Sequence, residues 1–277
     1  MRSYFKLVNF ELGRFMKIYL VLIGITIISQ IAGVIVKSRG YLSEANQAII
    51  VNSMPKEQFL EQFGQMSMGT FTQSIWFMGP IALCIAALIF YCFFIWYRDW
   101  FGKNTFIYRL LMLPTARLHV FLAKVTTIFL LVIGLVSIQL ILLPIESMIL
   151  KFIVPIDLRA DLGIMEIISN SRYLFVLVPD SFIQFIINYG IGFMVVFIIF
   201  TAILFERSFR LKGILLGIVY SVLSIIVFIF PLLLEIFFGV NYLYPTELFV
   251  TEVILAIIVI CAAIWTSNYL INKKVTV

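Results

Sequence analysis

Charged and chemically reactive residues are scarce in this chain. Only 12% of its 277 residues are charged and 63% are apolar, whereas soluble domains average about 25% and roughly 45–50%. The single histidine is His119, and the cysteines Cys84, Cys92 and Cys261 lie inside apolar runs without a CxxC spacing. This composition excludes a disulfide framework and gives no reason to expect a soluble enzyme or a metal site.

Motifs of nucleotide and hydrolytic chemistry are also absent. A P-loop reads GxxxxGK[ST], but Gly102-Lys103 is followed by Asn104 and has Tyr97 where the first glycine would stand. HExxH and GxSxG do not occur either. We therefore predict that the chain is not an enzyme, has no catalytic residue, and holds neither a metal nor a cofactor of its own.

Six long apolar runs dominate what is present. A hydrocarbon core about 30 Å thick needs around 20 apolar residues per helix, and lipid offers no partner for a free backbone N–H or C=O, so the runs must be helical. The first run lacks a signal-peptide cleavage site, and we expect it to be a permanent helix. The sequence predicts an all-α membrane protein, a single transmembrane domain over 1–277, with spans at 18–36, 75–96, 121–143, 182–204, 214–238 and 248–269.

The sign of the charges between the runs predicts their orientation. With an inner N-terminus, the inner segments are 1–17, 97–120, 205–213 and 270–277. These segments and the adjoining helix ends hold 14 of the 20 Lys and Arg but 3 of the 14 Asp and Glu, so the inner side carries +11 and the outer side −5. Lys and Arg are retained in the cytoplasm. We expect a multi-pass protein of the cell membrane with both termini cytoplasmic, and no nucleic-acid binding.

Three segments outside the spans have recognisable patterns. In 1–17, apolar residues recur at helical spacing, which is typical of an amphipathic interfacial helix, although a plain cytoplasmic extension is the alternative. The outer loops 37–74 and 144–181 are each too short for a domain of their own. Pro144 and Pro155 punctuate the second loop, and Ile164–Ile168 is expected to form a short helix.

The inner segment 97–120 favours a short helix at about 104–113. Gly102 ends the second span, Asn104 or Thr105 can cap a new helix, and Pro114 stops it. The helix is too short to span and carries aromatic and charged residues. It suits either a docking surface for a partner or an anchor among lipid headgroups.

This order of parts resembles the permease subunit of type-2 ABC exporters. The match is carried by Trp96–Lys124, with a Leu-Pro followed by a basic residue, and by ERSFRLKG at Glu206–Gly213. The loop 144–181 is longer than the family's link, and the family's re-entrant element is reduced to a stretch near Glu235–Pro245. The Glu-Ala-Ala loop of importer permeases is missing, which favours export.

The resemblance implies a mechanism and partners. The chain is expected to pair with a second permease chain, the same or related, and with two separately encoded ATPase subunits that hold ATP and Mg²⁺. The helix at 104–113 would be the coupling helix. The residues expected to dock the ATPase are Arg98, Asp99, Trp100, Phe101, Lys103, Asn104, Phe106 and Arg109.

Residue type predicts a packing or translocation role for a few further positions in or beside the spans. Gly213 and Gly217 form a GxxxG and are expected to pack helices closely. Polar residues in lipid face protein or a wet path, or hydrogen-bond between helices. The candidates for a translocation path are Gln139, Gln184, Asn188 and Glu252.

The apolar, phenylalanine-rich spans favour amphipathic peptides or hydrophobic compounds as cargo. An alternative function uses the same inner helix without transport. In that case the chain would be a membrane scaffold or sensor that recruits a cytoplasmic partner.

Overall fold

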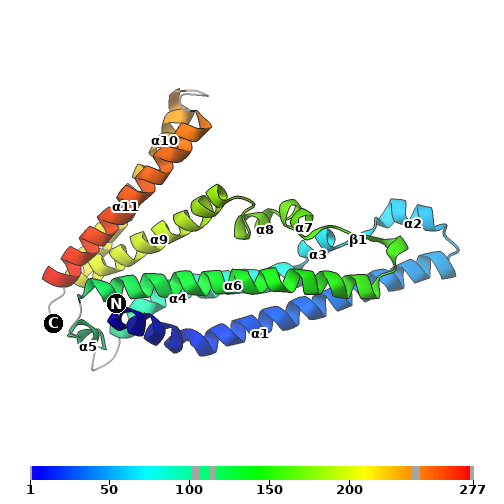
Figure 1. The fold of residues 1–277 in the computed structure, drawn as a ribbon, viewed down its shortest axis with the longest axis horizontal. Helices are drawn as coiled ribbons and strands as arrows, with labels where there is room; N and C mark the ends of the chain where they lie inside the picture. Colours follow the sequence, from blue (N-terminus) through cyan, green and yellow to red (C-terminus); the bar gives the residue numbers. More distant parts are fainter. Residues whose placement is uncertain (1, 101–105, 113–115, 239–243, 275–277) are drawn as a thin grey trace. The chain divides into compact units, whose positions relative to one another are not determined.

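The long apolar runs form six long helices in the computed structural model, which describes residues 2–100, 106–112, 116–238 and 244–274 (Figure 1). Each is long and apolar enough to cross a membrane. They are α1 (Arg2–Asn46), α4 (Ile75–Trp100), α6 (Leu118–Ile153), α9 (Phe182–Phe209), α10 (Leu211–Phe238) and α11 (Pro245–Lys273). The prediction of an all-α protein with six candidate spans is confirmed.

All six helices extend beyond the predicted spans, and α1 and α6 do so the most. The N-terminal segment 1–17 does not form a separate element, because α1 continues through it from Arg2 without a break. Helix α6 passes through Pro144, where we expected the span to end, and reaches Ile153. Leu150 is buried beyond that proline, and its packing offsets the backbone hydrogen bond that Pro144 cannot make.

The chain divides into two compact units. The first, unit 1, comprises 1–14, 89–130 and 181–277, and the second, unit 2, comprises 15–88 and 131–180. Helices α1, α4 and α6 each contribute residues to both units. The prediction of one permease domain over the whole chain is not tested by this division.

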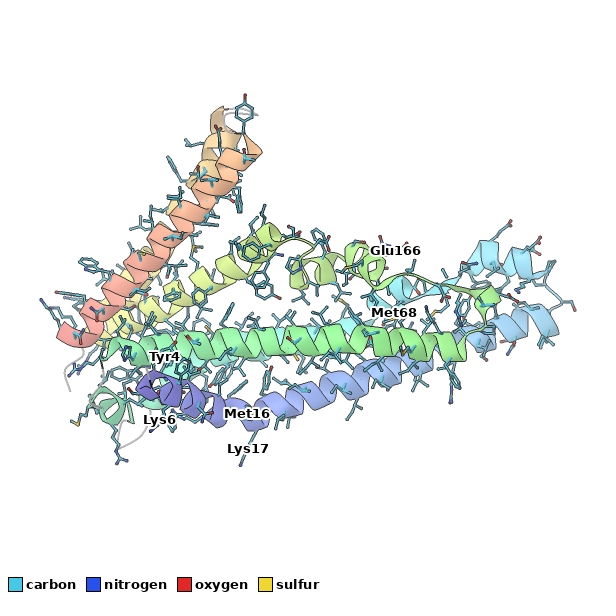
Figure 2. All side chains as sticks on the ribbon, viewed as in Figure 1. Tyr4, Lys6, Met16, Lys17, Met68 and Glu166 are labelled. Carbon is cyan, nitrogen blue, oxygen red and sulfur yellow. The ribbon has the colours of Figure 1, made fainter. Side chains whose placement is uncertain are left out.

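In unit 2 the two loops that are too short to fold alone build one core together. Their strands β1 (Met66–Ser67) and β2 (Arg159–Ala160) pair in parallel, with Met66 opposite Arg159. We call the part formed by 47–74 and 154–178 the module. Met68 of α3 (Met68–Thr72) and Glu166 of α7 (Ile164–Asn170) lie on neighbouring helices of the module (Figure 2). The remaining short elements are η1 (Gln47–Val51), α2 (Lys56–Phe63), α3 (Met68–Thr72), η2 (Ile156–Leu158), α7 (Ile164–Asn170) and α8 (Arg172–Leu177).

Apolar packing and a few polar ties hold this module. Its core includes Phe59, Phe71 and Ile167, which have almost no exposed surface. The ammonium of Lys56 lies 2.8 Å from Asp157, and its hydrogen bond and charge hold the pKa of that carboxyl below its ordinary value. The helix expected at Ile164–Ile168 is present as α7.

Unit 1 contains the short helix α5 (Phe106–Leu111) and the three C-terminal helices. Helices α9, α10 and α11 pack against one another (Figure 1). Met194 and Ile198 of α9 are buried against Val259 of α11. A single residue, Arg210, separates α9 from α10, and its φ of 54° is unusual for a residue other than glycine.

Candidate functional site

The short helix α5 has one buried face and one exposed face. Ile107, Leu110 and Leu111 are almost fully buried, at the i, i+3, i+4 spacing of a single helix face. Arg109 and Met112 are exposed on the other side, and Met112 has 70% of its surface accessible. This pattern fixes which side of α5 can meet another protein.

The buried face of α5 contacts the beginnings of two spans. Leu110 packs in a cluster with Leu7 and Val8 of α1 and with Val120 and Ala123 of α6. Leu7 and Val8 lie more than 100 positions before the other three residues in the sequence. Helix α5 is therefore fixed to the ends of α1 and α6 and does not lie free at a surface.

A second group of side chains, from α4, α9 and α11, lies beside α5. The rings of Trp100 and Tyr108 meet edge to face with centroids 6.4 Å apart. A space of ≈ 10 Å³ is all that remains in this contact, which is at the lower limit for one water molecule. It is lined by Trp96, Trp100, Ile107, Leu111, Val120, Leu204 and Ile271.

Five charged residues beside this contact form a buried network, which we call the charge cluster: Glu11, Arg14, Arg98, Asp99 and Lys124. The Lys124 ammonium donates to Glu11 Oε1 at 2.6 Å and to Asp99 Oδ2 at 2.5 Å. Arg98 donates to Glu11 Oε2 at 3.0 Å, and Arg14 donates to Asp99 Oδ1 at 2.7 Å. The cluster joins α1, α4 and α6.

The centre of the charge cluster is shielded from solvent. Lys124 and Asp99 have no exposed surface, and Glu11 has almost none. The third hydrogen bond of Lys124 goes to the carbonyl of Ile95 at 3.0 Å, so all three ammonium protons have partners. The Trp96 ring lies 5.3 Å from the same nitrogen. Two carboxylates against three cations leave the cluster with a net charge of +1.

A smaller polar contact connects α4 with the end of α9. Tyr97 donates a short hydrogen bond to Glu206, and the Arg207 guanidinium lies 4.6 Å from the Tyr97 ring centre and 5.7 Å from that of Trp100. Arg117 donates to the carbonyl of Ile271 at 3.2 Å. These contacts bring the segment at 206–213 next to the region around α5.

The predicted docking residues occupy different positions. Arg109 is exposed, whereas Asp99 has no exposed surface and Arg98 is mostly buried in the charge cluster. Trp100 packs under α5, so its ring supports that helix. Phe101, Lys103 and Asn104 lie outside the described residues, as does the side chain of Phe106. The docking role stays a prediction, which Arg109 carries best.

The predicted path residues belong to both units. In unit 2, Gln139 accepts a hydrogen bond from Gln30 at 3.0 Å and lines a cavity of ≈ 80 Å³ with Thr26 and Cys84. In unit 1, Glu252 lines a cavity of ≈ 180 Å³.

The two other predicted path residues, Gln184 and Asn188, are half-buried on α9. The backbone N–H of Gln184 is capped by Ser181 at 3.2 Å. Neither residue lines either of these cavities.

Glu146 is a buried carboxyl that sequence reasoning missed. It has no exposed surface, and neither of its oxygens has a hydrogen-bond partner among the described residues. Contacts of Tyr19 with Leu131 and of Gln30 with Gln139 show that α1 and α6 run in the same direction. Continuing this register places Ser38, which is also buried without a partner, level with Glu146.

Removing this carboxyl is expected to stabilise the protein. Desolvating a polar group without a partner costs about 1–3 kcal/mol by mutational estimates, so Glu146→Leu should raise the free energy of unfolding by a similar amount. Glu146→Gln keeps a polar group and should change it less. Both are measured by thermal unfolding of the purified protein. A lower melting temperature for both variants would mean that the carboxyl has a partner in the folded protein.

No protein-family model, no curated protein and no solved structure matches this chain. Helix length and hydropathy indicate a multi-pass membrane protein.

Proposed function

We propose that this chain is the membrane-spanning subunit of an ATP-driven exporter of the type-2 ABC class. In this proposal it works with a second permease chain and with separate ATPase subunits that supply the nucleotide site. The observation that supports it best is the placement of α5. This helix follows the second candidate span, buries one face against the chain's own helices and turns Arg109 and Met112 outward.

The contacts of helix α5 would transmit a movement of this helix to the spans. Its buried face contacts the start of α1 and of α6, and the charge cluster ties the same two helices to α4. Three helices that are joined in this way move together when one contact is pushed, because packed interfaces change by discrete rearrangement. An ATPase that moved α5 would therefore move the ends of three spans at once.

The distribution of charge supports an ATPase that binds on the cytoplasmic side. The segments predicted to be inner carry +11 and include α5, whereas the outer segments carry −5. The proposed topology has both termini and α5 in the cytoplasm of the cell. The module formed by 47–74 and 154–178 then lies on the outer side.

The proposal is tested by purifying this chain from its own cells and identifying the ABC ATPase that co-purifies with it. Arg109→Glu combined with Met112→Asp changes one exposed side chain of α5 and the exposed residue directly after it, and leaves the buried face of α5 intact. We expect the recovered ATPase to fall at least about tenfold, because a few central contacts carry most of the binding energy of an interface. ATP-dependent uptake of a labelled amphipathic peptide into inverted vesicles should fall with it.

Arg39→Glu is the matched control. Arg39 is also exposed, but it lies on the part of α1 that we assign to the outer side, so ATPase recovery should be unchanged. Equal recovery of the ATPase with the α5 variant would contradict the docking role. Recovery of a kinase or regulator in place of an ATPase would favour the scaffold function.

A further inference from the structure

A cavity of ≈ 180 Å³ lies among α9, α10 and α11 in unit 1. Ile187 and Gly190 of α9, Phe228 of α10 and Ala256 of α11 are part of its wall. A cavity of about 150 Å³ with apolar walls can hold one benzene molecule. This space therefore fits one ring or a short alkyl group, not a whole peptide.

The wall of this cavity contains one polar side chain, that of Glu252. All other residues that line it are apolar. Glu252 makes no hydrogen bond or ion pair with any residue that the structure describes, and it is half-buried. An ionised carboxylate beside apolar walls is poorly solvated, and a cation that reaches it gains more than it would in water.

The stretches of α9, α10 and α11 that surround the cavity contain no cationic residue. The sequence has no Lys, Arg or His between 181 and 206 or between 213 and 272, and the charged residues in these stretches are all acidic: Glu206, Glu235, Glu247 and Glu252. The carboxylate is therefore not neutralised by its own surroundings. The rings of Phe228 and Phe249 also line the cavity, and the faces of aromatic rings attract cations.

We propose that this cavity binds the end of a cationic amphiphile, in which a protonated amine lies next to an aliphatic or aromatic group. The ammonium pairs with the Glu252 carboxylate, and the apolar group fills the space between Phe228 and Ala256. As a statement about cargo, this inference rests on the proposed export function. As a statement about binding, it stands on the cavity alone.

Equilibrium binding to the full chain in phosphatidylcholine nanodiscs tests the inference. The probe is 2-phenylethylamine, which is protonated at pH 7, and 2-phenylethanol is its neutral counterpart. We expect the amine to bind at least tenfold more tightly than the alcohol. Glu252→Gln should remove this preference and leave the affinity for the alcohol unchanged. Ala256→Leu, which fills the cavity, should weaken both.

Glu247→Gln is the control, because Glu247 is an exposed acid in the first turn of α11 and does not line the cavity. It should bind both probes as the unmodified chain does. Equal affinity of the unmodified chain for both probes would overturn the inference, even if Glu252→Gln failed to fold. Absence of amine binding, as expected if lipid fills the cavity, would also overturn it.

These outcomes are independent of the exporter proposal, because binding in nanodiscs needs no ATPase. An amine preference that depends on Glu252, without ATP-dependent uptake in vesicles, would leave the site standing and contradict export. Uptake without that preference would support export and contradict this site.

Discussion

Replacing Lys124 with methionine is expected to destabilise unit 1 by about 3 kcal/mol or more. The substitution keeps most of the side-chain volume but removes the fully buried ammonium that donates hydrogen bonds to both Glu11 and Asp99 in the centre of the charge cluster. Removing one partner of a buried ion pair costs about 3–5 kcal/mol. Here two buried carboxylates each lose a hydrogen bond, although Arg98 still pairs with Glu11 and Arg14 with Asp99, so we expect the lower end of that range. Lys124→Met should therefore lower the melting temperature strongly.

The cysteines provide a way to follow this unfolding. Cys84 and Cys92 are buried and Cys261 is exposed, so a thiol-reactive dye reports unfolding once Cys261 is replaced by serine. Cys92 lies on the part of α4 that belongs to unit 1. Lys6→Met is the control, because it makes the same substitution at an exposed position near the start of α1 (Figure 2). Its melting temperature should equal that of the parent chain.

A double-mutant cycle distinguishes the interaction energy between Lys124 and Asp99 from the cost of losing either charge alone. If Lys124 and Asp99 act as a pair, adding Asp99→Asn to Lys124→Met should cost much less than Asp99→Asn costs alone. The difference should be about 1–3 kcal/mol, the range found for residues in direct contact. Strict additivity of the two substitutions would contradict the pairing.

The sequence does not reveal the charge cluster because its members are far apart in the chain. Lys124 lies 113 positions from Glu11 and 25 from Asp99. Counting charge by sign predicts that these residues lie on the inner side, but it does not predict which of them contact one another. One signal was present: Lys124 lies three residues inside a predicted span, and an ionisable residue there needs a partner.

The spans themselves could be predicted because they depend on a local property. About 20 apolar residues in a row satisfy the thickness of the bilayer wherever the rest of the chain lies. The same reasoning failed at Pro144, because the continuation of α6 depends on packing with residues such as Phe59 that are distant in sequence. Glu146 was therefore assigned to a loop and not recognised as buried.

The two cavities illustrate the same limit. Residue type alone selected Gln139 and Glu252 as candidates within spans, together with Gln184 and Asn188. Which of these residues faces an open space depends on the rotation of each helix against its neighbours. That rotation is set by side chains on other helices and is not encoded in any single span.

Substituting alanine for Gly213 is expected to prevent the packing of α10 against α9. Only Arg210 links these helices, so α10 begins close to the end of α9. A Cβ atom at position 213 would overlap the carbonyl oxygen of Phe205 and lie 2.8 Å from the Cα of Glu206. Both are backbone atoms that a rotamer change cannot move. Overpacking usually costs about 1–3 kcal/mol and more where the backbone must shift, and we expect the upper end here.

The second glycine of the GxxxG predicts a smaller effect. A Cβ atom at Gly217 would lie 2.9 Å from the carbonyl oxygen of Ala202, so Gly217→Ala requires a smaller shift than Gly213→Ala. Gly192→Ala is the matched control on α9, because a Cβ atom there meets nothing within 4 Å. It should be neutral or stabilising by up to about 1 kcal/mol, since alanine favours helix over glycine.

The ranking of the melting temperatures of these three variants tests whether the GxxxG packs helices within one chain. Thermal unfolding of the purified chain should rank Gly192→Ala highest, Gly217→Ala next and Gly213→Ala lowest, at any protein concentration. A GxxxG that instead joined two copies of the chain would make the loss at Gly213 smaller on dilution. Because Phe205 and Ala202 belong to the same chain, we expect the ranking to be independent of concentration.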